Sequence, residues 1–370
     1  MPEVLDPAIG GQQSMSDTSP RNLFSRARKS TSPRESRRHG RGHRLRRVLV
    51  ISGVSLVLVV GIVAGAGFLA VNHMLSSIHR IGHIAALTSS DQPVMPQSTR
   101  KSTTVLLTGS VNALANRGGG ALGSSTAPQR PSGLIALVHL NADGHTGAVV
   151  SIPPNAVVYV PGHGYLRLQE TLALGGPSLL IKTVERMTNV RIDHYSVLNF
   201  TGAVNVVSAL GGVNVDVPYP VASFGHTFYA GENHLTGAEV LAYVRQPQVS
   251  DVGRVLLQQN LIRAILEKAA TVNLAGDYSL VSAIAGALSV DSNFTNSQIT
   301  SLAIKLSRFS SKTAVFVTAP TVGGSPISGG NEPLSLNRKI SRKLWNAIRH
   351  DSVAAFARQY PSTVTISDPG

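Results

Sequence analysis

Residues 133–153, GLIALVHLNADGHTGAVVSIP, contain two apolar runs that predict neighbouring β-strands. The runs GLIALVHLN and GAVVSIP are rich in β-branched and aliphatic residues, and ADGHT separates them. The Asp143-Gly144 pair in this connection is typical of a tight turn between antiparallel strands. We therefore expect a β-hairpin here.

The sequence on either side of this hairpin alternates between strand-like and helix-like patterns. TTVLLTG at 103–109 is typical of a buried strand, and the Gly-, Ser- and Ala-rich stretch 112–129 is expected to be a surface loop. Further strands are expected at 194–200, 213–221 and 314–320, and helices at 175–189, 201–212, 236–244, 253–270, 279–289, 296–308 and 337–349. This alternation predicts one α/β domain with helices on both faces of a mixed sheet.

A long apolar segment precedes this domain. Residues 48–71, VLVISGVSLVLVVGIVAGAGFLAV, carry no charge, and as a helix they would reach about 36 Å, enough to cross a hydrocarbon core of about 30 Å. The segment is longer than the apolar part of a signal peptide, and its 47-residue basic lead is too long for the usual signal. We expect a single transmembrane helix with the Arg-rich end in the cytoplasm.

The distribution of charge decides against a nucleic-acid binder. The chain carries a formal charge of +14. Half of this excess lies in residues 1–47, which contain eleven Lys and Arg but only four Asp and Glu. This tail is expected to be disordered, to orient the membrane helix and to contact anionic lipid headgroups. No helix-turn-helix pattern supports a role in transcription. The absence of cysteine excludes disulfides and thiolate sites.

The order of several segments resembles the LytR-CpsA-Psr (LCP) family of bacterial cell-envelope proteins. The matching segments are TVLLTGS, LIALVHLN, VVSIP, the run from Val160 to Tyr195, LGGVNVDVP, GENHLTGAEVLAYVR and GRVLLQQNLIRAIL. The resemblance implies an α/β/α sandwich that holds a polyprenyl-linked glycan (pyro)phosphate and transfers the glycan to peptidoglycan. It covers about residues 103–270.

This resemblance predicts the domain organisation. We expect a cytoplasmic tail (1–47), a transmembrane helix (48–71), a connector (72–102) with helical character around Met74 to Leu87, an extracytoplasmic LCP-like domain (103–320) and a C-terminal extension with a final helix (321–370). The chain would then be a single-pass protein of the plasma membrane, with the C-terminal domain outside.

Four residues carry the phosphate-binding prediction. Arg245 and Arg254 match arginines of the family's motifs, Gln258 matches its glutamine, and Arg130 lies one residue out of register with a further family arginine. Arg suits this role because its planar fork binds two phosphate oxygens at once. Arg254 and Gln258 are four residues apart on a predicted helix, so they share a face. The simpler alternative is that these are surface residues, with Arg254 paired to Asp251.

Several positions depart from the family pattern, and these include both aspartates that the resemblance assigns to a metal ion. The residues in the departing slots are Val111, Pro131, Gly133, Leu134, Pro154, Asn155 and Pro247. Because hard cations require oxygen ligands, we expect no Mg²⁺ site of the family type and no other cofactor.

The resemblance leaves two functions open. The first is attachment of cell-wall glycopolymer to peptidoglycan, with a polyprenyl-phosphate-linked glycan, peptidoglycan and the bilayer as partners. The second is a binding or scaffold protein of the cell envelope that has kept the lipid site and lost transfer. The missing aspartates leave the enzymatic activity undecided, and fold similarity alone does not choose between the two functions.

Overall fold

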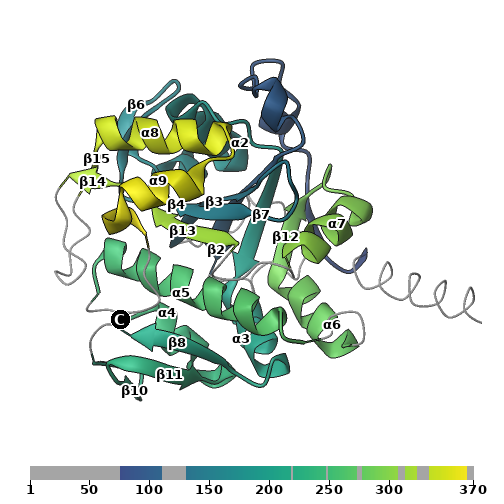
Figure 1. Cartoon of the computed structure of the whole chain (residues 1–370), viewed down its shortest axis with the longest axis vertical. Coiled ribbons are helices and arrows are strands. Elements are labelled where there is room, and N and C mark those ends of the chain that lie inside the picture. The colour runs from purple at the N-terminus through teal and green to yellow at the C-terminus, as the bar shows by residue number, and fades with distance from the viewer. Residues whose placement is uncertain are drawn as a thin grey trace, which may run out of the picture. The chain divides into compact units, whose positions relative to one another are not determined.

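A seven-stranded mixed sheet forms the centre of the described part of the chain (Figure 1). The computed structural model describes residues 76–110, 131–217, 220–246, 249–272, 277–306, 313–322 and 333–364. The strand order is β1-β12-β7-β2-β3-β4-β13, and β2 runs parallel to β7 and antiparallel to β3. The prediction of an α/β fold with a mixed sheet is confirmed.

The central strands β2 and β4 of this sheet are almost entirely buried, whereas β1, β7 and β12 are partly exposed. Their bounds are β1 His79–Ile81, β2 Thr103–Ser110, β3 Pro131–Leu140, β4 Gly147–Ser151, β7 His194–Asn199, β12 Leu288–Asp291 and β13 Ala314–Thr318. The predicted hairpin joins β3 to β4 in antiparallel register. At its turn Asp143 Oδ1 accepts hydrogen bonds from the backbone N–H groups of His145 and Thr146, and Gly144 has a φ of 70°.

Four helices cover one face of the sheet (Figure 1): α3 (Phe200–Ala209), α4 (Val240–Val244), α5 (Asp251–Ala269) and α6 (Tyr278–Ala287). The sheet contributes Leu107, Leu134 and Phe316 to the core on this side. Helix α5 is enclosed on most of its surface, since every side chain from 252 to 267 is buried or half-buried. Helix α7 (Asn296–Leu306) packs through Ile299 into a smaller cluster with Val290 of β12.

Three other helices cover the opposite face: α2 (Glu170–Thr188), α8 (Arg338–Arg349) and α9 (Val353–Gln359). Alternate residues of the same strands, such as Leu106, Ile135 and Val317, point to this side, as the period of two in a strand requires. Helix α8 adds Trp345 and Ile348 to the core.

Four two-stranded pairs flank the main sheet. They are β5 (Val157–Val160) with β6 (Gly164–Arg167), β8 (Val213–Val217) with β11 (Gly231–Leu235), β9 (Val221–Ser223) with β10 (His226–Phe228), and β14 (Thr321–Val322) with β15 (Ser335–Leu336). Short 3-10 helices are η1 (Ala85–Thr88), η2 (Gln97–Thr99), η4 (Gly237–Glu239) and η5 (Pro361–Thr363).

The connector keeps only part of its predicted helical character among the described residues. Residue 76 is helical and 85–88 form a short 3-10 helix, but residues 79–81 form β1, which pairs in parallel with β12 at one end of the sheet. Arg80 fixes this strand by donating to the backbone carbonyl of Phe294 and to the side chain of Asn296. Edge pairing therefore overrides the local sequence preference.

Three further predictions were wrong in detail. The segment 279–289 ends as strand β12, because α6 stops at Ala287. The segment 213–221 divides into β8 and β9, and 236–244 begins with the 3-10 helix η4 before α4. The helix predicted at 175–189 is present as the part of α2 that follows a kink at Gly175 and Gly176, and the structure adds a short helical segment from Glu170 before that kink.

No helix within the described residues combines the length and apolar character needed to cross a bilayer. The predicted membrane helix at 48–71, the basic tail and the loop 112–129 lie outside the described residues.

Candidate functional site

Three of the predicted site residues, Arg245, Arg254 and Gln258, belong to the end of α4 and the first half of α5. Arg245 is the residue that closes α4, and its backbone N–H bonds to the carbonyl of Leu241 at 3.2 Å. Its side chain is half-buried, and burial lowers the pKa of its guanidinium. A cation held partly out of water in this way gains most when an anion binds beside it.

The first turn of α5 places the second arginine. The Ser250 hydroxyl caps the helix by accepting from the N–H of Gly253 at 3.2 Å. Arg254 lies one turn in and is half-buried, and its Nη2 lies 3.5 Å from the carbonyl oxygen of Val249. Its guanidinium therefore folds back over the connection that begins after Arg245, beside a helix N-terminus whose dipole favours an anion.

Two glutamine amides at this junction are almost fully buried. Gln258, one turn after Arg254, is 2% exposed, and Gln246, directly after Arg245, is 1% exposed. Gln258 Oε1 and Gln246 Nε2 have no hydrogen-bond partner among the described residues. Since a buried amide atom without a partner is costly, both atoms are suited to bind a polar ligand group.

A third glutamine fixes α5 against the sheet. Gln259 is fully buried, and its Nε2 donates to Ser151 Oγ at 2.7 Å and to the Val317 carbonyl at 2.9 Å. On the other side of the helix, Asn260 Nδ2 donates to the Asp216 carbonyl of β8 at 3.0 Å. Neither positioning residue was predicted from the sequence, although two consecutive polar residues between the apolar positions of a helix were a usable signal.

The strand ends near α5 carry the positions that depart from the family pattern. Gly133 in β3 faces Pro154, and a Cβ added at Gly133 would lie 3.3 Å from the Pro154 ring carbon Cγ. Proline and glycine thus pack together in the slots that the family resemblance assigns to charged residues. The pair supplies no side-chain oxygen, and the described residues contain no cluster of three or more metal-ligating His, Asp or Glu side chains.

The residues present therefore do not fit the magnesium ion that the family resemblance implies. Within the Pro154–Asn155 pair, the amide group of the buried Asn155 supplies the one side-chain oxygen. No catalytic step is assigned to a metal here.

Arg254 and Gln258 lie one turn apart in α5, and Gln246 follows Arg245 at the end of α4, so the shared role of these side chains in phosphate binding stays a prediction. Arg130, Val111 and Pro247 lie outside the described residues, and Asp251 is described only as the first residue of α5. A salt bridge between Arg254 and Asp251 is therefore not tested.

Comparisons with known proteins give the family of the chain. Residues 72–350 match the sequence model of the LytR_cpsA_psr family. A Bacillus subtilis relative named polyisoprenyl-teichoic acid–peptidoglycan teichoic acid transferase TagT is 31% identical over 61% of this chain and 71% of its own. A Bacillus anthracis relative with the corresponding name, TagU, is 31% identical over 45% of this chain, which spans 55% of that relative's length.

A solved structure shares the fold. The structure described as TagT bound to LIIa-WTA has a TM-score of 0.51 and 25% sequence identity, over 71% of this chain and 96% of the other.

Proposed function

Because the chain belongs to the LytR_cpsA_psr family, we propose that it binds a polyprenyl-(pyro)phosphate-linked glycan and attaches cell-wall glycopolymer to peptidoglycan. The observation that carries this proposal is the junction of α4 and α5, because Arg245 ends α4 and Arg254 and Gln258 lie one turn apart in the first half of α5. The names of the matched relatives describe transferases that act on teichoic acid and peptidoglycan.

The chain is anchored by residues 48–71, with its C-terminal part outside the cell. The support for this topology is the 24-residue uncharged run and the excess of Arg before it. A lipid-linked donor at the outer leaflet and peptidoglycan would then both be within reach of the described domain.

The site residues bind and orient the charged end of the donor. Arg245 and Arg254 neutralise phosphate oxygens, and the buried amide of Gln258 orients the group between them. Arg130 replaces the arginine missing from its motif. An acceptor hydroxyl oxygen attacks the phosphorus that carries the glycan, and the bond from that phosphorus to the polyprenyl phosphate breaks. The hydroxyl proton is lost to solvent.

Apolar side chains beside the site suit the polyprenyl chain. Helices α5, α6 and α7 present partly buried apolar residues next to the main core, namely Ile262, Ile265, Leu266, Ile284 and Leu302. These aliphatic side chains are partly exposed, so a long hydrocarbon chain could cover them. Each Å² of apolar surface buried in this way would contribute about 25 cal/mol of favourable free energy.

Transfer is tested with the purified full chain, a polyprenyl-pyrophosphate-linked glycan and peptidoglycan, with and without EDTA. Appearance of glycan on peptidoglycan supports the proposal, and failure to bind any polyprenyl phosphate overturns it. Lys268→Ala, on the exposed last turn of α5, is a matched control that should behave as wild type.

A second function is favoured by one observation. The Gly133–Pro154 contact occupies the place of charged family residues, and a chain without them is suited to bind the lipid phosphate as a scaffold that does not catalyse transfer. Bound lipid with no transfer under any metal condition would identify this second function.

A further inference from the structure

The helices that cover one face of the sheet expose almost only positive charge. Helix α8 exposes Arg338, Lys339, Arg342 and Lys343. Helices α2 and α9 add Lys182, Arg186 and Arg358. These seven side chains form what we call the basic layer.

No ion pair joins a carboxylate to these side chains within the described residues, although exposed Asp91 lies next to Gln92, which bonds to Glu185 of α2. Glu185 of α2 is buried, and Glu170 is half-buried and accepts from the N–H of Arg167. None of the four ion pairs between described residues includes a member of the basic layer. Instead, Arg186 lies over the ring of Tyr159, and Lys343 lies over that of Tyr360.

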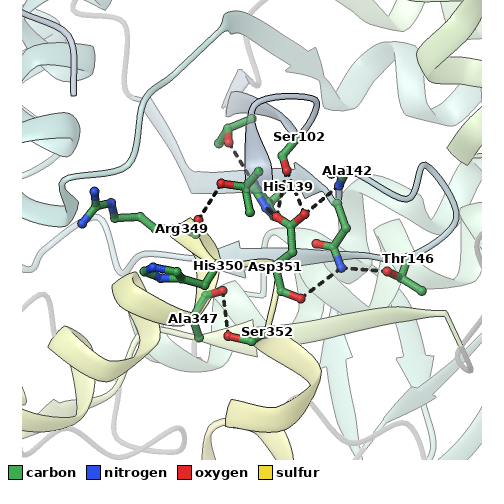
Figure 2. A network of polar contacts seen from close by, with 12 residues as sticks. Ser102, His139, Ala142, Thr146, Ala347, Arg349, His350, Asp351 and Ser352 are labelled. Atoms are coloured by element: carbon green, nitrogen blue, oxygen red, sulfur yellow. Dashed lines mark hydrogen bonds and ion pairs between the residues drawn. The ribbon is translucent and has the colours of Figure 1, made fainter. Parts of the chain in front are cut away.

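The one carboxylate near the end of α8 is turned inward. Asp351 accepts hydrogen bonds from Ser102 Oγ and the N–H of Ala142 and lies 2.9 Å from His139 Nε2 (Figure 2). Its charge is therefore used to fasten the C-terminal helices and does not offset the basic layer.

The outer surface of α8 does not suit insertion into a bilayer. Its apolar residues Leu344, Trp345 and Ile348 are buried against the sheet. An interfacial membrane helix presents such residues to the lipid, together with its basic ones. Helix α8, about 18 Å long, presents only polar and charged side chains, so its recognition is electrostatic.

The start of α8 is connected to the same end of the sheet as the candidate site. Asn337, the N-cap of α8, donates its N–H to the Pro320 carbonyl at 2.8 Å. Three residues before Pro320, Val317 accepts from Gln259 of α5, the neighbour of Gln258. The start of α8 and the strand that holds α5 in place are therefore joined through the end of β13.

We propose that the basic layer binds the phosphate-rich chain of the glycopolymer that the lipid carries, an inference that rests on the proposed function. The i, i+4 pairs Arg338–Arg342 and Lys339–Lys343 form two parallel rows, in which neighbouring side chains lie about 5–6 Å apart at Cβ. Such rows fit a linear polymer with repeated phosphodiesters. The charge complementarity favours this polymer over an uncharged glycan.

The test uses the full chain in non-ionic detergent and fluorescently labelled poly(glycerol phosphate), followed by anisotropy. Arg338→Gln/Arg342→Gln should weaken binding about 30-fold at low salt, from about a factor of 5 per basic side chain near a polyanion. The control Lys268→Gln/Lys305→Gln removes the same charge from α5 and α7 and should change binding little. Thermal unfolding checks that both variants fold.

Three results would overturn the proposal: equal binding by both double variants, equal competition by uncharged dextran, or stronger competition per phosphate by anionic bicelles than by unlabelled polymer. The last result would identify a membrane surface as the ligand. Polyprenyl phosphate binding is measured separately. If wild type binds the polymer but no polyprenyl phosphate, the proposed function is contradicted. If wild type binds polyprenyl phosphate but its binding of the polymer does not depend on the charges of α8, only the role of the basic layer is contradicted.

Discussion

Asp351 Oδ1 lies 2.9 Å from Nε2 of His139, and this contact joins the turn between α8 and α9 to strand β3 (Figure 2). The other ring nitrogen of His139 lies 2.9 Å from Thr104 Oγ1 of β2, and the imidazole is fully buried. The network thus connects two central strands to the C-terminal helices, which carry much of the basic layer.

Replacing Asp351 by Asn should destabilise the fold by about 2–3 kcal/mol, because it leaves the buried His139 and Ser102 with poorer acceptors. Burial alone would raise the pKa of Asp351, but hydrogen bonds from His139, Ala142 and Ser102 hold it below its ordinary value. The stability that the ionised carboxylate of Asp351 contributes is therefore present above about pH 4, which is the pKa of an aspartate in the unfolded chain. This stability is lost as the pH falls through the lower pKa of the folded state. Urea denaturation at pH 7 and at pH 3 measures it. Asp91→Asn, at an exposed position, is the control, and equal loss in both variants would contradict the assignment.

Glu185 should give the opposite dependence on pH. Burial raises the pKa of this carboxyl to about 7, despite hydrogen bonds from the Ile192 N–H and Gln92 Nε2. Because the folded pKa lies above the unfolded one, the stability that protonation contributes is full below about pH 4.5 and is lost as the pH rises towards 7. Glu185→Gln should therefore gain stability relative to wild type between these values, on the order of 3 kcal/mol in total. A difference that does not vary with pH would show that folding does not shift the pKa of Glu185.

Arg254→Ala should weaken binding of polyprenyl phosphate by about 1.5–3 kcal/mol if its guanidinium pairs with the charged group. The half-buried side chain already lies at the N-terminus of α5, beside the connection that follows Arg245. Binding is measured by titration calorimetry of the full chain, with Lys268→Ala as the control on the same helix. An unchanged affinity in Arg254→Ala would remove this residue from the site.

The sequence predicted most of the sheet because its central strands are buried on both faces and read as continuous apolar runs, as in β2 and β4. It did not predict β1 and β12, since strands of three and four residues are too short to show a period and are stabilised by pairing with each other.

The candidate site shows the same limit. Helical spacing was enough to place Arg254 and Gln258 on one face of α5. It did not distinguish Gln258, whose amide has an atom without a partner, from Gln259, whose amide fastens the helix to β4 and β13. The Gly133–Pro154 contact depends on how β3 meets the loop after β4, so only the tertiary structure shows that these two departures from the family pattern fill one space.

Two glycines at the contact between α3 and α6 should respond in opposite ways to the same substitution. A Cβ at Gly202 of α3 would lie 2.5 Å from the Cα of Ala287, a backbone atom that cannot move aside alone. Gly202→Ala should therefore separate the two helices and cost about 1–3 kcal/mol or more. Gly286, on the exposed side of α6, has no atom within 4 Å of its added Cβ. Gly286→Ala should instead stabilise the chain by about 0.5–1 kcal/mol, because alanine loses less conformational entropy in a helix. Chemical denaturation of the two variants measures both values.

Because α3 and α6 cover the same face as α5, Gly202→Ala should also weaken polyprenyl phosphate binding, whereas Gly286→Ala should leave it unchanged. Equal stability changes of the same sign would show that the close approach of α3 to α6 does not hold in solution.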